Sequence, residues 1–275
     1  APRPFPQPLW LGDPPIAGKT LLIHAEQGFG DFIQCCRYAS LAEARGARVV
    51  LEVPAALQAL VSSLRGNFTI VARGDVLPHF DFHCPVMSLP LAFRTTVRTI
   101  PASVPYLFAD PARLQVWRQR LGTRDRMRVG LAWSGNPAHK NDLNRSIPAS
   151  LLAPLLSLPV EFHVLQKGIR PEDAAAIAGF GNVHVHEIGD FSDTAALAQE
   201  MDLVISVDTS VAHVAGAMGR PLWLLLPFNQ DYRWLLDRSD SPWYPSATLF
   251  RQPASGDWPS VIARVARQLR ALTER

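Results

Sequence analysis

A polar motif follows an apolar stretch in the second half of the chain. Val204-Ile-Ser-Val-Asp208-Thr209-Ser210 runs into Val-Ala-His213 and then into a segment of small residues. The first turn of a helix exposes unpaired N–H groups and a partial positive charge, which together bind anions. We therefore predict a phosphate site at Thr209 and Ser210, with His213 one turn along the same helix face. In the alternative interpretation, Asp208 only caps the helix and His213 lies on its surface.

A second polar loop, Glu26-Gln27-Gly28-Phe29-Gly30-Asp31, follows the apolar stretch 20–25. Gly28 and Gly30 favour a tight turn that lets a substrate approach the backbone. Asp31 either caps the helix that begins there or takes a proton from an acceptor hydroxyl as a general base.

Two further loops combine cations with the ends of apolar stretches. One runs from Trp133-Ser134-Gly135 to Lys140 and Arg145, and the other is Gln166-Lys167-Gly168. Each is either a solvated polar loop or a source of positive charge for phosphates bound near Thr209.

Strands that alternate with helices must position these loops. The predicted strands cover 20–25, 48–53, 68–71, 81–84, 128–133, 160–165, 183–185, 203–206 and 222–226. The predicted helices cover 31–45, 54–64, 111–121, 149–158, 171–178, 193–200, 210–219 and 258–272. This alternation indicates parallel sheets, in which ligands bind beyond the carboxyl ends of the strands. We expect two α/β domains facing a cleft, at 18–124 and 125–255, and a closing helix at 256–275.

Composition excludes several classes of protein. The chain is 48% hydrophobic and 19% charged, which is opposite to the balance of a disordered chain. No apolar run approaches the roughly 18 residues of a membrane helix, so no transmembrane segment is expected. The net charge of +3 comes without a basic cluster, which argues against nucleic-acid binding. Cys35, Cys36 and Cys84 form no CxxC pair, which favours small buried thiols, no metal site and a cytoplasmic location.

The first 17 residues place proline at every second position from Pro2 to Pro8 and are interpreted as an extended linker. Since the sequence begins without Met, we expect another domain before this linker. His184 and His186 lack a third partner in sequence and are interpreted as structural. Trp234 and Pro242-Trp-Tyr-Pro245 form either an aromatic packing cluster or a surface for a sugar ring.

The motif from Asp208 to Ala217 resembles the nucleotide-sugar site of the heptosyltransferase-like glycosyltransferases, glycosyltransferase family 9. The resemblance continues through Gly189-Asp190, Asp193-Thr-Ala-Ala-Leu and Gly30-Asp31, although Ser210 stands where glycine is usual. The tail from Asp240-Ser-Pro-Trp-Tyr-Pro245 to Gly256-Asp-Trp258 is similar to bacterial proteins that join such a domain to tetratricopeptide repeats. Those repeats would lie upstream of residue 1.

The resemblance implies a GT-B-like fold of two Rossmann-like, doubly wound domains. It implies inverting, metal-independent transfer, without a cofactor, from a UDP- or ADP-linked sugar to a hydroxyl of a protein, peptide or glycolipid. Asp31 would be the catalytic base, and Gln27, Gly28 and Gly30 would form the acceptor loop. The donor would be bound by Ser134, Lys140, Arg145, Gln166, Lys167, Asp208, Thr209, Ser210 and His213.

Two other functions are alternatives, the second weaker than the first. One is a non-catalytic binding domain that scaffolds a partner of a tetratricopeptide repeat protein. The other is a nucleotide-sugar epimerase, which needs more carboxylates in the cleft than the sequence offers.

Overall fold

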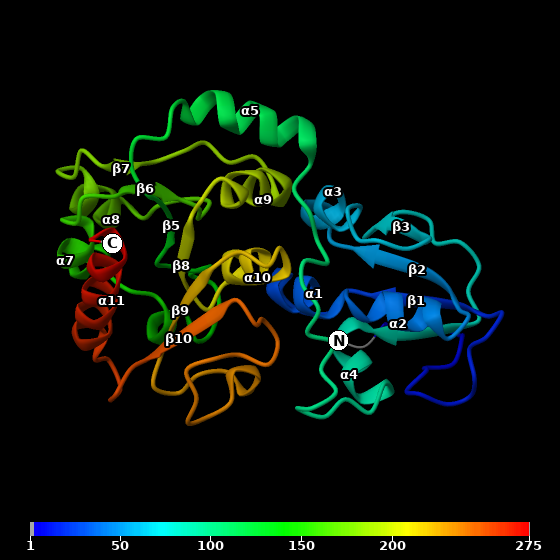
Figure 1. The fold of residues 1–275 in the computed structure, drawn as a ribbon. Helices are drawn as coiled ribbons and strands as arrows, with labels where there is room; N and C mark the ends of the chain where they lie inside the picture. The colour runs from blue at the N-terminus through cyan, green and yellow to red at the C-terminus, as the bar shows by residue number, and fades with distance from the viewer. Residues whose placement is uncertain (1–2, 275) are drawn as a thin grey trace.

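The computed structural model describes residues 3–274, which fold around two parallel β-sheets (Figure 1). In the first sheet the strand order is β3-β2-β1-β4, and in the second it is β10-β9-β8-β5-β6-β7. The strands of the first sheet are β1 (Thr20–His24), β2 (Arg48–Val53), β3 (Phe68–Ala72) and β4 (Phe82–Pro85). Those of the second are β5 (Arg128–Ala132), β6 (Glu161–Val164), β7 (Val183–His184), β8 (Leu203–Val207), β9 (Leu222–Leu226) and β10 (Ala247–Arg251). The α/β prediction is confirmed, and only β10 lacks a counterpart among the predicted strands.

The helices lie within or close to the predicted ranges, except that the predicted 31–45 helix is divided in two and that the short helices at 89–92 and 142–145 were not predicted. In the first half these are α1 (Phe29–Cys35), α2 (Tyr38–Ala44), α3 (Gln58–Val61) and α4 (Leu89–Ala92), with short 3-10 turns η1 (Ala55–Leu57) and η2 (Val86–Ser88). Next come α5 (Pro111–Leu121), α6 (Asp142–Arg145), α7 (Ala153–Leu156), α8 (Pro171–Ile177), α9 (Phe191–Gln199), α10 (Ser210–Ala217) and α11 (Trp258–Thr273). The 3-10 turns η3 (Ala149–Leu152) and η4 (Tyr232–Trp234) complete the second half. No helix within this described part is both long enough and apolar enough to span a membrane.

The two faces of the first sheet are covered differently. Helices pack against the face that carries Leu21 and Ile23, whereas Phe5 and Phe80 from extended segments pack against the other face. The proline-rich segment is therefore not a free linker. Trp10 is only 1% exposed, and the neighbouring Leu9 pairs with His83 of β4. Residues 1 and 2 of that predicted linker lie outside the described residues.

The two halves of the chain meet at α1 and α10, which lie side by side at the centre of Figure 1. One apolar cluster extends from the helices of the first sheet to α9 and α10 of the second. Arg37 interrupts the predicted 31–45 helix and crosses this junction: it donates to the carbonyls of Pro101 and Trp243 at 3.0 and 2.9 Å.

The boundary between domains at residue 124 stays a prediction. Helix α5, which precedes that boundary, packs against α9 of the second half. Arg113 of α5 pairs with Asp190 at 3.0 Å and with Asp193 at 2.9 Å. The contacts of α5 are thus with the second sheet layer, although the sequence placed this helix in the first domain.

The three cysteines are free and buried. Burial raises the pKa of Cys35, Cys36 and Cys84 to about 12 each, so the thiols are protonated at neutral pH. They fill space as small apolar groups, as the sequence analysis expects.

Two buried histidines have strongly depressed pKa values. His163 lies beside His184 and is hydrogen-bonded to His186 at 2.9 Å, and burial together with these neighbours lowers its pKa to about 3. His24 lies beside His83 under Phe5, and burial together with His83 lowers its pKa to about 4. Both rings are therefore neutral at pH 7, which avoids a buried positive charge.

We expect the free energy of unfolding to fall when the pH is lowered from 7 to 5. Histidines in the unfolded chain take up protons near pH 6.5, whereas folded His163 and His24 stay neutral down to about pH 3 and about pH 4. The unfolded state therefore binds more protons in this window, which lowers stability by about 2 kcal/mol per histidine at pH 5. Urea denaturation at the two pH values measures the loss.

The variant His163→Gln removes one of these titrating groups and should make the loss smaller. The exposed His79 serves as control, because His79→Gln should leave the loss unchanged. An equal loss in the parent and both variants would show that His163 does not contribute to the pH dependence.

Candidate functional site

A cleft of about 1200 Å³ lies between the two halves, at the carboxyl ends of strands from both sheets. In the second sheet β5 is paired with β6 on one side and β8 on the other, so the loops after these strands surround a topological switch point. Residues that line the polar and charged part of the cleft include Gln27–Asp31, Ser134, Arg145, Gln166, Lys167, Asp208–Ser210, His213, Asp231 and Arg233.

Gln166 organises the side of the cleft formed by β5 and β6. Its Oε1 accepts hydrogen bonds from the backbone N–H groups of Trp133 and Ser134 at 2.9 and 3.1 Å. Its Nε2 donates to the Ser134 hydroxyl at 2.8 Å. These hydrogen bonds of the Gln166 side chain fix the loop that follows β5, and they hold Ser134 at the cleft surface.

The phosphate site predicted from the sequence lies at the start of α10. Thr209 is the residue that precedes the helix, and its side chain makes no hydrogen bond to the helix backbone. Arg145 donates to the Asp208 carbonyl at 3.0 Å, which brings a guanidinium beside the same helix terminus. Thr209, Ser210 and Arg145 all line the cleft, so unpaired helix N–H groups, hydroxyls and a cation come together there.

The alternative interpretation of Asp208 and His213 is wrong. Asp208 is not the cap of α10: its carboxylate accepts from the Trp234 indole N–H at 2.9 Å. Burial raises the pKa of Asp208, against the opposing effects of Arg233 and the Trp234 hydrogen bond. His213 is only 2% exposed and lies inside the junction of the two halves.

His213 is a neutral side chain with both ring nitrogens in contact with polar groups. Burial, with Arg233 and Arg37 nearby, lowers its pKa well below 6.5. Nδ1 lies 2.8 Å from the Tyr244 hydroxyl, and Nε2 lies 3.4 Å from Nη1 of Arg233. Nε2 also lies 3.8 Å from a carboxylate oxygen of Asp208, so the ring is surrounded by polar groups.

Asp31 projects from the first turn of α1 into the cleft. One carboxylate oxygen accepts from the backbone N–H of Gly28 at 2.9 Å. The other accepts from Nη2 of Arg233 at 2.7 Å, across 202 positions of sequence. The N-cap of α1 is Gly28 and not Asp31, but the Asp31 carboxylate completes the cap from within the first turn and also lines the cleft.

Glycine is present at position 30 for a different reason from the one that the sequence suggested. Neither Gly28 nor Gly30 adopts a positive φ, so the turn does not need the conformational freedom of glycine. A Cβ at Gly30 would instead lie 2.6 Å from Cδ2 of His213. The missing side chain lets α1 approach α10, and Gly30 therefore shapes the junction.

The remaining predicted site residues differ in whether they line the cleft. Gln27, Gly28 and Lys167 line the cleft, and Lys167 donates to the Gly189 carbonyl at 2.8 Å. Lys140 is exposed and does not line the cleft.

The aromatic cluster belongs to the core. Trp234 and Tyr244 are fully buried, and Trp243 is nearly so. None of the three lines the cleft, so the cluster is a packing feature and the alternative of a sugar-binding surface there is not supported.

Sequence reasoning missed Arg233 and Asp231. Both lie in the loop that follows β9, at the same edge of the sheet as the loops that were recognised. The available signal was that this loop follows a buried parallel strand, where ligand sites form. Its charged residues, however, are also typical of a solvated surface loop.

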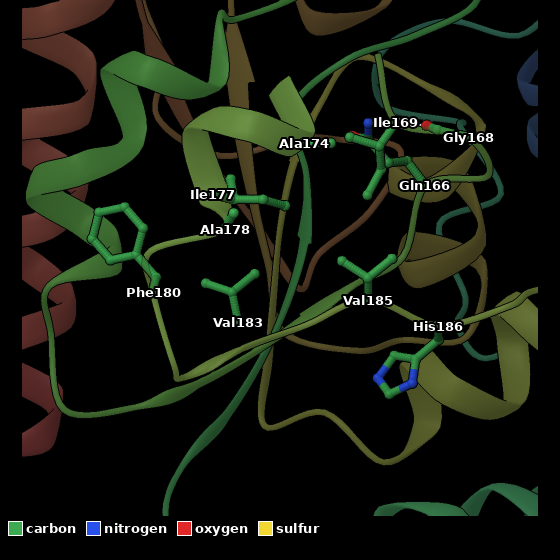
Figure 2. A pocket seen from close by; sticks show the side chains of 10 residues that line it. All are labelled: Gln166, Gly168, Ile169, Ala174, Ile177, Ala178, Phe180, Val183, Val185 and His186. Atoms are coloured by element: carbon green, nitrogen blue, oxygen red, sulfur yellow. Dashed lines mark hydrogen bonds between the residues drawn. The ribbon is translucent and has the colours of Figure 1, made fainter. Parts of the chain in front are cut away.

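A second hollow of about 470 Å³ adjoins the cleft and is mostly apolar (Figure 2). Side chains from α8, from β7 and from the connection between them surround it, among them Ile177, Val183 and Phe180. It offers no carboxylate or cation among its lining residues, so the chemistry of the site lies in the larger cleft. Between residues 3 and 274, no three His, Cys, Asp or Glu side chains are grouped as a metal site requires.

Comparison with known sequences points to one family. Residues 178–234 match the profile of glycosyltransferase family 9 (heptosyltransferase). Protein FlbA of Caulobacter vibrioides is 29% identical over 299 residues, covering 98% of this chain and 49% of that protein. The chain thus spans about half the length of this relative.

Solved structures share the fold. A glycosyl transferase family 9 protein from Veillonella parvula has a TM-score of 0.67 at 12% identity, covering 94% of this chain and 98% of its own. The ADP-heptose lipopolysaccharide heptosyltransferase II of E. coli has a TM-score of 0.63 at 14% identity, covering 93% and 98%. The iron-containing dodecameric glycosyltransferase TibC of E. coli has a TM-score of 0.58 at 12% identity, covering 88% and 65%. The GT-B-like fold prediction is confirmed, and the family profile matches only residues 178–234.

We expect Gly30→Ala to destabilise the junction between the halves. The new methyl group meets the His213 ring, which Tyr244 and Arg233 hold in place, so α1 must move away from α10. Overpacking of this kind lowers the free energy of unfolding by about 1–3 kcal/mol, which urea denaturation measures. Gly179→Ala is the control, because a Cβ there meets no atom within 4 Å. Equal stability of the two variants would contradict the role assigned to Gly30.

Proposed function

We propose that this chain is an inverting glycosyltransferase that moves a sugar from a nucleoside-diphosphate donor to a hydroxyl acceptor. The observation that carries the proposal is the cleft itself. It brings Asp31, a carboxylate of the first half, together with the start of α10 at Ser210 and the Arg145 cation of the second half.

The donor diphosphate would bind at the start of α10. Negative charge develops on the diphosphate as the bond to the sugar breaks, and preorganised donors stabilise that charge. The N–H groups of the first turn, the hydroxyls of Thr209 and Ser210 and the guanidinium of Arg145 supply such donors. We propose that these groups do this work without a metal ion, and that Gln166 and Lys167 line the nucleotide pocket. Lys140, which lies outside the cleft, has no part in this arrangement.

Asp31 would act on the acceptor. Its carboxylate takes the proton of the acceptor hydroxyl, the oxygen attacks the anomeric carbon, and the nucleoside diphosphate leaves with the bonding electrons. Attack from the face opposite the leaving group inverts the anomeric carbon. Gln27 and Gly28 lie beside Asp31 and would form the wall against which the acceptor rests.

The nucleotide of the donor is ADP or UDP in this proposal. The E. coli neighbour, described as an ADP-heptose heptosyltransferase, favours testing ADP first. We propose a protein, peptide or glycolipid acceptor and tetratricopeptide repeats upstream.

Thr209→Val should weaken nucleotide binding. The substitution keeps the shape of the side chain and removes a hydroxyl that would donate to a phosphate, which is worth about 1.5 kcal/mol or about tenfold in affinity. Calorimetric titration with ADP and UDP measures the affinity. Thr69→Val on the exposed side of β3 is the matched control and should bind as the parent does. Unchanged affinity in Thr209→Val would remove the phosphate site from α10.

Asp31→Asn should lower transfer by about 10²- to 10⁴-fold while nucleotide binding persists. A general base contributes a factor of this size to the rate, and the amide cannot accept the proton. Transfer is measured with ADP- and UDP-linked radiolabelled sugars and a cell extract that supplies the acceptors. The exposed Asp75 gives the control variant, Asp75→Asn, which should transfer normally. Parent protein that binds a nucleotide but transfers no sugar would favour the scaffold function.

A further inference from the structure

We propose that Arg233 is the positioning residue for the Asp31 carboxylate, which it holds in place from the opposite half of the chain. This inference rests on the proposed glycosyl transfer and adds to it a residue that couples the donor side of the cleft to the acceptor side.

The guanidinium of Arg233 makes three polar contacts in different directions. Nη2 donates to Asp31 at 2.7 Å, Nε donates to Asp231 at 2.8 Å, and Nη1 lies 3.4 Å from Nε2 of His213. The Arg233 side chain is 9% exposed and the Asp31 side chain 17%. One buried cation thus touches the predicted base and the predicted donor-site histidine at the same time.

The loop that carries Arg233 is fixed within the second half. Asp231 caps the short turn η4 by accepting from the backbone N–H of Arg233 at 3.0 Å. The next residue, Trp234, donates its indole N–H to Asp208, and its carbonyl accepts from Arg251 at 2.7 Å. The guanidinium is therefore anchored before it reaches Asp31, so it can impose a position on that carboxylate.

Carboxylates surround Arg233 and stabilise its positive charge, so a neutral side chain at this position would leave them without this counter-charge. Burial alone would lower its pKa, but Asp231, Asp31 and Asp208 together raise it well above its usual range. His213 is neutral and adds no positive charge. Without Arg233, the Gly28 N–H would still hold one oxygen of Asp31, but the other oxygen would have no cation in direct contact and its orientation would no longer be fixed.

The contacts also distinguish arginine from lysine. Arginine presents a planar fork that reaches Asp31, Asp231 and His213 together, whereas lysine offers one compact ammonium group. Arg233→Lys should therefore keep the charge and lose part of the orientation.

A double-mutant cycle of Asp31→Asn and Arg233→Gln tests the proposal. Sugar transfer is measured with ADP- and UDP-linked sugars and the acceptor extract, and ADP and UDP titrations report nucleotide binding. Arg233→Gln should lower transfer by about 100-fold, since small misplacements of reacting groups have effects of that size. Its nucleotide affinity should change by less than about fivefold. In the Asp31→Asn background, Arg233→Gln should cause no further loss, because its effect acts through Asp31.

Two more variants complete the test. Arg233→Lys should recover about tenfold of the lost transfer, which a purely structural contact would not predict. Arg238→Gln removes a surface arginine that pairs with Asp240 and should behave as the parent does. If Arg233→Gln fails to bind nucleotide, the cycle is run with Arg233→Lys instead. Arg233→Lys should lower transfer in the otherwise unchanged protein, and it should not lower transfer further in the Asp31→Asn variant.

The outcomes separate this inference from the proposed function. Normal transfer by Asp31→Asn overturns the base assignment and, with it, the role of Arg233. Transfer lowered by Asp31→Asn but unaffected by the Arg233 variants overturns the inference alone. A third outcome also overturns the inference. Arg233→Gln could lower the residual transfer of Asp31→Asn by the same factor as it lowers transfer of the parent, and Arg233 would then act independently of the carboxylate.

Discussion

The buried guanidinium of Arg233 pairs with Asp31 of the first half and Asp231 of the second, and this pairing constrains how the two halves of the chain pack together. Charges removed from water are costly unless they are paired and hydrogen-bonded. The bond from Arg233 to Asp31 therefore constrains the distance between α1 and the loop after β9. Arg37 adds a second bridge, from the first half to the Trp243 carbonyl. The small residue Gly30 permits the close contact of α1 with His213 that these bonds require.

The fold could largely be predicted from the sequence because its signals are local. Buried strands such as β9 and helices such as α5 begin and end at the predicted residues. The errors arose where tertiary contacts override local preference. The predicted 31–45 helix is divided at Cys36 and Arg37, and the Arg37 side chain bonds to carbonyls on distant segments that no local pattern reveals. Trp10 docks an apparent linker onto the first sheet through burial that no local pattern encodes.

The candidate site was predictable wherever it lies at the end of a strand. The loops with Asp31 and Thr209 were found this way, and both line one cleft. Arg233 was missed because its partner is 202 positions away and its loop resembles a polar surface. Lys140 was included because its loop begins at the cleft, yet the loop carries this side chain out to solvent. Spacing in sequence thus locates the loops, whereas only the folded chain shows which side chains turn inward.

The central claim is that a nucleoside diphosphate binds between the halves at the start of α10. The most direct test is a crystal structure of the protein with ADP or UDP. The account predicts the diphosphate against the N–H groups of Thr209 and Ser210, within hydrogen-bond distance of Arg145, and Asp31 still paired with Arg233 on the acceptor side. A nucleotide bound in the apolar hollow of Figure 2, or elsewhere outside the cleft, would contradict it.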